Sequence, residues 1–357
     1  MRVLTIDESS PYHKIVGVGG IGSGIFFALD GNHTLRRNES RAAALLPVRD
    51  YCKLHIVLHY VAKLLGAGKS SFRVVPIGNV GDDEHGHRLL QEMADTGMDV
   101  SCLSVTAGKP TLFSVCFQYP DGEGGNLTAN NSAAADLSAN EVNIYKEKLF
   151  ADEGTRTLAL AVPEVSLEAR HHFLQRATEA GAYRAASFLA EEIADARRSG
   201  AFALLDLVSL NSSEAAELVG RKVSANRDEF VDTCLEFLQS GFPQLGMVVT
   251  SGKDGAFAFS RGSFVYCPAY DVEIGSTAGA GDALLGGVLS ALAAGVPLLK
   301  ARKSENQLSS ALELGVLLAS FKCQSEHTIH PSASLDDLIQ FAGTKGLQLD
   351  AFLSAAS

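Results

Sequence analysis

The sequence predicts an α/β fold in which a mostly parallel central sheet is covered by helices on both faces, with a small β-sheet lid. Short apolar or β-branched runs alternate with longer helical patterns along the chain, and two segments rich in turn residues interrupt this alternation. Alternation favours parallel pairing, because each crossover helix returns the chain to the same edge of the sheet. The 357 residues fit a single domain with appended lid segments.

Six strands are expected from apolar and β-branched runs that are bounded by turn residues. They are residues 13–19, 72–77, 156–162, 184–188, 202–207 and 247–250. Longer stretches between them show helical periodicity of apolar residues. These predicted helices are residues 50–65, 84–95, 139–149, 167–180, 190–198, 213–219, 227–239, 281–292 and 305–321.

Two segments, at about residues 25–41 and 111–131, break the alternation. The first contains the turn residues Asp30, Gly31 and Asn32, and the second contains an apolar run followed by a Gly-rich turn at 121–125. Both segments are typical of hairpins, which predicts a small antiparallel sheet. Such a sheet can close over a substrate and expel water. The alternative is a pair of ordinary surface hairpins.

Charge and cysteine content narrow the classes of partner. The net charge of −11 argues against a general nucleic-acid surface, although backbone amides can still bind phosphate locally. The six cysteines are scattered without a CxxC pair, which indicates reduced thiols in a cytoplasmic protein. The first residues lack the apolar segment of a signal peptide, and no apolar run approaches the ~18 residues that span a bilayer. We therefore expect neither nucleic acid nor a membrane as a partner.

The Gly-rich stretch 274–287 is the strongest local signal. Gly279, Ala280, Gly281 and Asp282 lead directly into an apolar helical pattern. Glycines allow the backbone to approach a ligand, and the first amides of a helix can hold phosphate oxygens. A carboxylate at the same helix start can accept a proton from an attacking hydroxyl. The structural alternative is that Asp282 only begins the helix.

Two further motifs are expected at the carboxyl edge of the sheet. Asn211 and Glu214 follow a predicted strand, where they could order hydrated Mg²⁺ and phosphate, or simply cap the next helix. Thr250, Gly252 and Gly255 lie in a strand–turn–strand pattern. They could face a nucleotide, or form an ordinary turn.

In this order, the three motifs resemble those of the PfkB (ribokinase-like) family of carbohydrate and nucleoside kinases. The stretches 78–86 and 96–100 also resemble the N-terminal half of that family, so the resemblance covers about residues 13–335. It implies a ribokinase-like three-layer α/β/α fold with a β-sheet lid. It also implies an ATP-dependent phosphotransferase that uses Mg²⁺ and phosphorylates a hydroxyl of a small molecule, with a sugar or sugar derivative expected first.

The resemblance implies a role for each matched residue. Asp282 would be the general base, and the backbone of Gly279, Ala280 and Gly281 with Asp282 would form the anion hole. Asn211 and Glu214 would organise the metal and the phosphates, with Glu214 holding Mg²⁺ through water. The nucleotide would contact Thr250, Gly252 and Gly255. Because family members often dimerise through the lid, a homodimer is also implied.

This sequence departs from the family pattern at three places. Ser276 replaces the Asp that commonly helps to hold a monovalent cation, which puts K⁺ use in doubt. The stretch 19–24 lacks the carboxylate that usually grips sugar hydroxyls, and residues 51–59 replace the usual Gly-Gly-x-Gly-x-Asn loop. An unusual acceptor is therefore expected. Lid residues that could contact it, or form a solvated hairpin, are Asn32, His33, Arg37, Asn38, Glu39 and Arg41.

Other functions stay open from the sequence. The acceptor could be an adenosine-like nucleoside, or the fold could serve as a non-catalytic ligand-binding protein, although binding alone does not need a base. The stretch 17–22 matches the GxGxxG pattern of NAD-dependent dehydrogenases, but Asp30 follows too soon for that motif. His55 and His59 could share a metal from one helix face, although no third ligand is evident.

Overall fold

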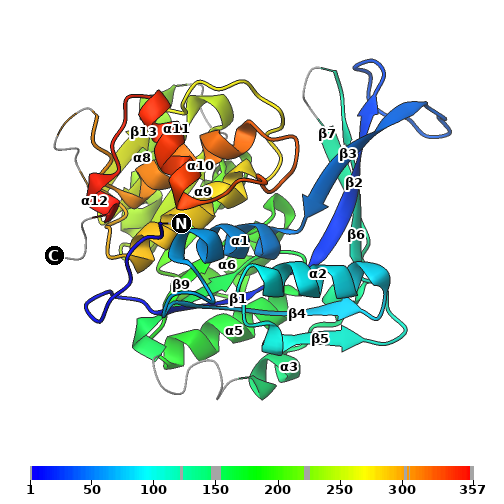
Figure 1. The fold of residues 1–357 in the computed structure, drawn as a ribbon, viewed down its shortest axis with the longest axis horizontal. Helices are drawn as coiled ribbons and strands as arrows, with labels where there is room; N and C mark the ends of the chain where they lie inside the picture. Colours follow the sequence, from blue (N-terminus) through cyan, green and yellow to red (C-terminus); the bar gives the residue numbers. More distant parts are fainter. Residues whose placement is uncertain are drawn as a thin grey trace.

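A nine-stranded sheet forms the centre of the molecule (Figure 1). The computed structural model describes residues 2–120, 124–145, 154–220, 226–300, 304 and 306–353. The strands of this sheet are β1 (Lys14–Val18), β4 (Arg73–Gly81), β5 (Leu103–Thr106), β8 (Thr157–Ala161), β9 (Tyr183–Ala186), β10 (Leu207–Asn211), β11 (Gly246–Thr250), β12 (Ala256–Ser260) and β13 (Ser263–Cys267). Their order is β13-β12-β11-β10-β9-β8-β1-β4-β5. All pairings from β11 to β5 are parallel, and β12 is antiparallel to both of its neighbours.

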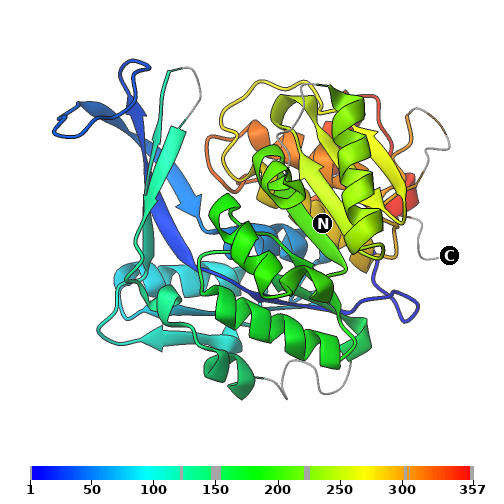
Figure 2. The same ribbon diagram turned by 180° about the vertical axis from the view of Figure 1, so that it is seen from behind.

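Helices cover both faces of this sheet. The layer at the front of Figure 1 contains α1 (Lys53–Leu65), α2 (Glu84–Asp95), α9 (Ala280–Ala293), α10 (Ala311–Cys323) and α11 (Leu335–Thr344). The other layer, which Figure 2 brings to the front, contains α3 (Ala139–Ile144), α5 (Leu167–Glu179), α6 (Ile193–Arg198), α7 (Ser212–Val219) and α8 (Arg227–Gly241). Each layer encloses a hydrophobic core, and Ile15 and Val16 of β1 belong to opposite cores because strand side chains alternate. The predicted three-layer α/β/α arrangement is confirmed.

Shorter helical elements complete the described chain. They are the 3₁₀ turns η1 (Val100–Cys102), η2 (Ala133–Asp136), η3 (Gly154–Arg156), η4 (Ala190–Glu192), η5 (Ala201–Leu204) and η6 (Gly252–Asp254), and the C-terminal helix α12 (Asp350–Leu353).

A second sheet of four strands projects from the body as a lid (Figure 1). Its order is β3-β2-β6-β7, with β2 (Gly22–Leu29), β3 (Ala43–Tyr51), β6 (Leu112–Gln118) and β7 (Gly124–Thr128). Two antiparallel hairpins, β2–β3 and β6–β7, join through parallel pairing of β2 with β6. The predicted lid segment 111–131 contains both strands of the β6–β7 hairpin, whereas the segment 25–41 contains most of β2 but none of β3. Residues 121–123 of the predicted turn lie outside the described residues.

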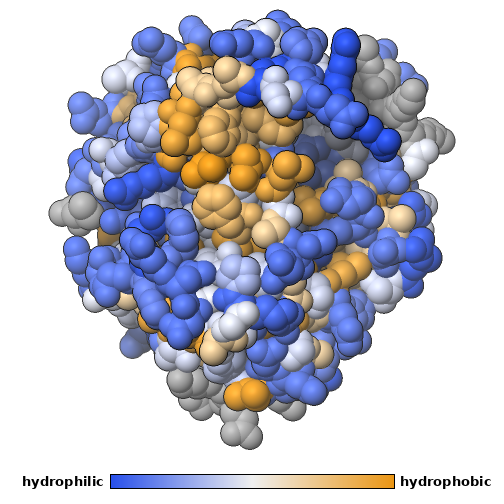
Figure 3. Space-filling model, turned by 90° about the vertical axis from the view of Figure 1, so that its right-hand side faces the viewer, coloured by the Kyte–Doolittle hydropathy of each residue, from blue (hydrophilic) through white to orange (hydrophobic). Residues whose placement is uncertain are grey.

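One face of the lid is apolar and turned away from the body. Ile25 pairs with Val115, Val115 pairs with Leu127, and Phe27 pairs with Leu45, which places these residues on the same face. Leu127 is 71% exposed and Leu45 is 61% exposed. Figure 3 views the molecule from the side that carries the lid and shows an apolar patch bordered by hydrophilic residues.

Three predicted element boundaries are wrong. Residues 202–207 were expected as a strand, but they contain the turn η5 and only the first residue of β10. The helix expected from residue 50 begins at Lys53, because Asp50 and Tyr51 pair with β2 and end strand β3. The helix expected from residue 305 begins at Ala311, where a reciprocal capping box fixes its first turn. The predicted helix 139–149 is described only to residue 145.

Helices α9 and α10 pack backbone against backbone. A Cβ atom added to Gly287 would lie 2.9 Å from the Cα of Gly315, and one added to Gly315 would lie 2.7 Å from the Leu284 carbonyl oxygen. Only glycine at both positions permits this close approach. Since Asp282 is in the first turn of α9, its position depends on this contact.

We predict that Gly315→Ala lowers the free energy of unfolding by about 1–3 kcal/mol, because the added methyl group forces the two helices apart. Equilibrium denaturation measures this loss. Gly343→Ala in α11 is the control, since a methyl group there meets no atom within 4 Å. That variant is expected to keep or slightly gain stability. Equal losses for both variants would contradict the role of the close contact.

Candidate active site

Helix α9 begins at the Gly-rich stretch that the sequence singled out. Gly279 precedes the helix with a φ angle of 77°, which is the left-handed region. A Cβ atom at Gly279 would also lie 2.5 Å from the Thr328 carbonyl oxygen, so glycine is required there. The chain consequently turns straight into α9, with Asp282 in its first turn.

The first amides of α9 differ in their hydrogen bonding. The Ala280 N–H donates to the Thr277 carbonyl oxygen at 3.1 Å. The N–H groups of Gly281 and Asp282 donate to no backbone carbonyl of the described chain. These two amides are at the positive end of the helix dipole and are available to an anion. The Ala280 amide, which the sequence analysis included in the anion hole, is already engaged.

Three charged side chains meet beside this helix start. The Lys53 Nζ atom lies 3.4 Å from the Asp282 Oδ1 atom, and the Glu164 Oε2 atom accepts the Lys53 backbone N–H at 3.2 Å. The Asp282 carboxylate raises the pKa of the Lys53 ammonium, and burial raises the pKa of Glu164 to about 7. Glu164 has a φ angle of 76°, a strained value for a non-glycine residue that is common at functional sites.

Lys53 and Glu164 were not predicted from the sequence as site residues. Glu164 follows the carboxyl end of β8. This position just after a strand could have identified Glu164 as a site residue, because Asn211 was identified by its position after a predicted strand. Lys53 lies inside the stretch 51–59, which was noted only as a departure from the family pattern.

A cavity of about 320 Å³ opens between this cluster and the lid. Its lid wall includes Phe26, Asp50, Ser114 and Cys116, and its floor includes Lys53, Glu164, Asp282 and Thr328. The Asp50 Oδ2 atom accepts a hydrogen bond from the Cys116 thiol at 3.5 Å, and burial raises the pKa of Asp50. Asp50 pairs with Gly24 across the lid sheet. The stretch 19–24 has no carboxylate of its own. Asp50, which pairs with Gly24 from β3, supplies one to the cavity.

A larger cavity of about 840 Å³ lies on the other side of the α9 start. The predicted residues Asn211, Thr250, Gly252, Gly255, Ala280 and Gly281 all line it. Tyr270, Val272, Leu284 and Val316 add an apolar wall. Thr277 lines both this cavity and the smaller one, so the two cavities adjoin at the start of α9.

Asn211 and Glu214 form a reciprocal capping box at the start of α7. The Glu214 N–H donates to Asn211 Oδ1 at 2.9 Å, and the Asn211 N–H donates to Glu214 Oε2 at 2.8 Å. Loss of hydration raises the pKa of Glu214, and the charges of Lys53 and Asp282 also act on it. The capping alternative is therefore observed. It engages one carboxylate oxygen and leaves the second oxygen for water or a cation.

The predicted lid contacts lie outside both cavities. Asn32, His33, Arg37, Asn38, Glu39 and Arg41 belong to the connection between β2 and β3, and none is among the described lining residues. The Arg41 Nε atom donates to Glu39 Oε1 at 2.7 Å, and the His33 ring bonds the same carboxylate at 3.1 Å. These side chains bind one another in this structure. Their contact with an acceptor stays a prediction.

The dehydrogenase alternative loses its structural basis. A dinucleotide motif needs a helix after its last glycine, but Gly22 begins strand β2. Burial lowers the pKa of both His55 and His59 to about 3, and their ring centroids are 6.3 Å apart. In the described part of the chain, no three His, Cys, Asp or Glu residues are grouped to hold a metal. None of the described helices has the length and apolar character to cross a membrane.

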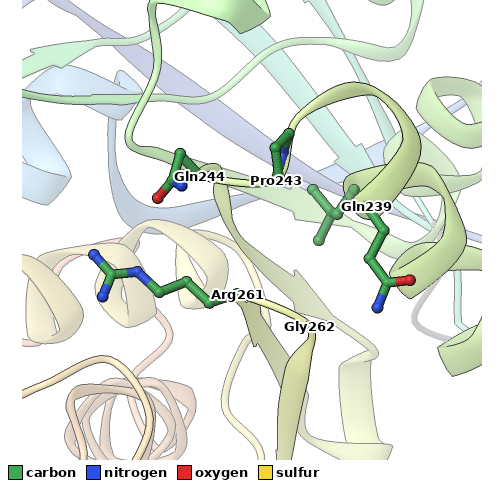
Figure 4. A pocket seen from close by; sticks show the side chains of 6 residues that line it. Gln239, Pro243, Gln244, Arg261 and Gly262 are labelled. Carbon is green, nitrogen blue, oxygen red and sulfur yellow. The ribbon is translucent and has the colours of Figure 1, made fainter.

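Figure 4 shows a third cavity, of about 620 Å³. It is lined by Leu238, Gln239, Pro243, Gln244, Arg261 and Gly262. These residues precede β11 or follow the antiparallel strand β12, so they lie at the amino edge of the parallel strands. Asp282 and the two other cavities are at the carboxyl edge, where open α/β sheets bind ligands.

Known proteins match both the sequence and the fold. Residues 57–335 match the family described as pfkB family carbohydrate kinase. A fructokinase from Klebsiella pneumoniae is 30% identical over 246 residues, which cover 66% of this chain and 75% of that relative. The structure of ribokinase from Giardia lamblia superposes with a TM-score of 0.76 at 18% identity, over 94% of this chain and 99% of that chain.

A second solved structure is ribokinase from Cryptococcus neoformans var. grubii serotype A in complex with ADP. It has a TM-score of 0.71 at 19% identity, over 92% of this chain and 99% of that chain. At these identities the two structures establish the fold alone. The family match covers more than half of the chain and includes the α9 start with Asp282. This protein is a kinase that belongs to the pfkB family of carbohydrate kinases.

Proposed function

We propose that this protein transfers the γ-phosphate of ATP to a hydroxyl group of an uncharged sugar or sugar derivative, with Asp282 as the general base. The meeting of two cavities at the start of α9 supports this function. A nucleotide in the larger cavity would present its terminal phosphate to the Gly281 and Asp282 amides. A hydroxyl in the smaller cavity would reach the Asp282 carboxylate.

The Lys53–Asp282 pair supports the assignment of the base. The Lys53 Nζ atom lies 3.4 Å from the Asp282 Oδ1 atom and can orient this carboxylate at the start of α9, where it would accept the proton. As the acceptor oxygen attacks the phosphorus atom, its proton would pass to Asp282. The Gly281 and Asp282 amides would stabilise the negative charge on the transferred group.

The donor set of the larger cavity fits ATP and Mg²⁺. A volume of about 840 Å³ with an apolar wall of Leu284 and Val316 suits a nucleotide base. Glu214 does not line this cavity, but it bonds to Asn211, which does. Mg²⁺ prefers oxygen ligands and keeps several waters, so Glu214 could hold it through water. When bound, Mg²⁺ supplies neutralisation of charge on the phosphates.

The charges of the smaller cavity support an uncharged acceptor. Its described lining contains three acidic side chains, of Asp50, Glu164 and Asp282, and a single ammonium, of Lys53, which Asp282 already balances. Because burial raises the pKa of Glu164 to about 7, Glu164 carries only part of its charge at neutral pH. A phosphate or carboxylate on the acceptor would therefore face uncompensated negative charge. Neutral hydroxyl groups can instead donate hydrogen bonds to Asp50 and Glu164. Phe26 lines the same cavity and could stack on a base, which keeps a nucleoside as the second candidate.

We also propose that two copies of the chain associate through the apolar face of the lid. Leu45 and Leu127 are both more than half exposed on that face, together with Ile25, Phe27 and Val115. An exposed apolar patch of this kind is typical of a protein interface. The same face on a second copy is a complementary partner for it.

We predict that Asp282→Asn lowers kcat by at least ~100-fold, which is the usual effect of removing a general base. The unfolding midpoint and the KM for ATP should stay unchanged. Sugar-stimulated ADP release measures the rate, and Asp195→Asn, at an exposed ion pair on α6, is the control. Undiminished turnover in Asp282→Asn would mean that another group is the base.

We predict that Asp50→Asn raises the KM for a free sugar by ~10-fold and reduces discrimination against its phosphate ester. A neutral amide accepts a weaker hydrogen bond than a carboxylate and does not repel an anion. Initial rates with free sugars, nucleosides and their phosphate esters measure both effects. Asp136→Asn, whose carboxylate pairs with Lys109 outside both cavities, is the control.

The wild-type protein tests the acceptor class directly. If it phosphorylates a sugar phosphate as efficiently as the free sugar, the charge argument is wrong. If no acceptor in the panel stimulates ADP release, the phosphotransfer function itself is contradicted.

We predict a dimer in solution that Leu127→Glu converts to a monomer, because a charge in an apolar interface is not compensated. Light scattering coupled to size-exclusion chromatography measures the mass. The control is Ile144→Glu, which changes an apolar residue of 75% exposure on α3, away from the lid. A monomeric wild-type protein at micromolar concentration would refute this interface.

A further inference from the structure

Lys322 is a buried charge that the reaction described above does not use. It is in the last turn of α10, and its side chain has 0% exposure. The Lys322 Nζ atom donates to the Ser276 carbonyl oxygen at 2.8 Å. Burial lowers the pKa of Lys322 to about 8, so the ammonium stays largely protonated at neutral pH. A buried charge is costly to maintain, which calls for a role beyond packing.

Ser276 belongs to the loop that leads into α9. The N–H groups of Gly275 and Ser276 both donate to the Cys323 carbonyl oxygen, at 2.9 and 3.3 Å. These bonds hold the loop against the end of α10. The Lys322 ammonium therefore contacts the loop from the α10 side, and the loop continues into the anion-binding amides of α9. The charge of Lys322 also interacts with Asp282 and Asp50. Lys322 therefore lies within electrostatic range of the reacting groups.

The same loop does not fit the monovalent cation that the family pattern implies. Ser276 has no negative charge, and its hydroxyl oxygen accepts the Ala278 N–H at 3.2 Å. Its carbonyl oxygen, a potential cation ligand, is occupied by the Lys322 ammonium. A K⁺ ion beside this ammonium would be repelled without a carboxylate to offset the charge.

We propose that the Lys322 ammonium is a built-in cation that replaces K⁺ behind the phosphate-binding loop and makes the activity independent of monovalent cations. This inference rests on the proposed phosphotransfer at Asp282. The ammonium fixes the Ser276 carbonyl and hence the loop that precedes Gly279. It also adds positive potential where negative charge develops on the transferred phosphate. Lys322 is a positioning residue, because it acts through the loop and its field.

The wild-type protein gives the first test. Its kcat and KM for ATP should be equal in buffers that contain choline, Na⁺ or K⁺ as the only monovalent cation. Activation by K⁺ of several-fold over choline would overturn the proposal, because a cation site would then be required.

Two variants separate charge from shape. Lys322→Met keeps much of the side-chain volume and removes the charge, and it should lose ~10–100-fold in kcat, the scale of lost electrostatic stabilisation. Lys322→Ala should lose a similar factor and recover at least part of it with K⁺, NH₄⁺ or methylammonium, but not with choline. Lys322→Arg is the charge-retaining control. Full activity of Lys322→Met, or failure of every cation to rescue Lys322→Ala, would overturn the proposal.

Thermal unfolding gives a readout that is independent of turnover. K⁺ and NH₄⁺ should raise the unfolding midpoint of Lys322→Ala above that in choline, since a ligand of the folded state stabilises it. They should not raise the midpoint of the wild type or of Lys322→Met. In Lys322→Ala combined with Asp282→Asn, the midpoint shift should persist although turnover is lost. A failure of the cation proposal is thus distinguishable from a failure of the proposed base.

Discussion

Backbone contacts hold the start of α9 in place. The positions of Asp282 and of the phosphate-binding amides depend on these contacts. Gly279 has a left-handed conformation and packs closely against the Thr328 carbonyl oxygen. N–H groups of the preceding loop donate hydrogen bonds to the Cys323 carbonyl oxygen. Behind them, Gly287 and Gly315 let α9 and α10 touch through their backbones. Backbone contacts lack the rotational freedom of side chains, so Asp282 and its neighbouring amides are held in place before any ligand binds.

Charged side chains of both signs surround the start of α9. Lys53 pairs with Asp282 where the two cavities adjoin, and Lys322 lies behind the loop. Glu164 lies beside Lys53 on the floor of the smaller cavity, and Asp50 lines its lid wall. Under the proposed function, the two ammonium groups stabilise negative charge on the transferred phosphate, and the two acidic side chains bind the acceptor hydroxyls. Closure of the lid would remove water and strengthen both effects.

Secondary structure was predictable wherever local signals agree with packing. Helix α2 has the predicted bounds, because its apolar residues are periodic and Asp83 caps its first turn. Strand β3 was missed, since a lid strand with one apolar outer face lacks the usual pattern of buried and exposed residues. The boundary between η5 and β10 was missed because the apolar run 201–205 continues from the turn towards the strand.

The sequence by itself determined the layered fold, the family and Asp282 at a Gly-rich helix start, because glycine spacing, capping residues and apolar periodicity are local properties. Tertiary structure decided which other side chains join Asp282. Asp50 ends a lid strand, Lys53 begins α1, Glu164 follows β8 and Lys322 is at the end of α10, so three widely separated parts of the chain supply them. Sheet pairing and the packing of α9 on α10 bring them together. Glu164 has a local signal, its position just after a strand, but Asp50, Lys53 and Lys322 acquire their roles only from neighbours that are remote in sequence.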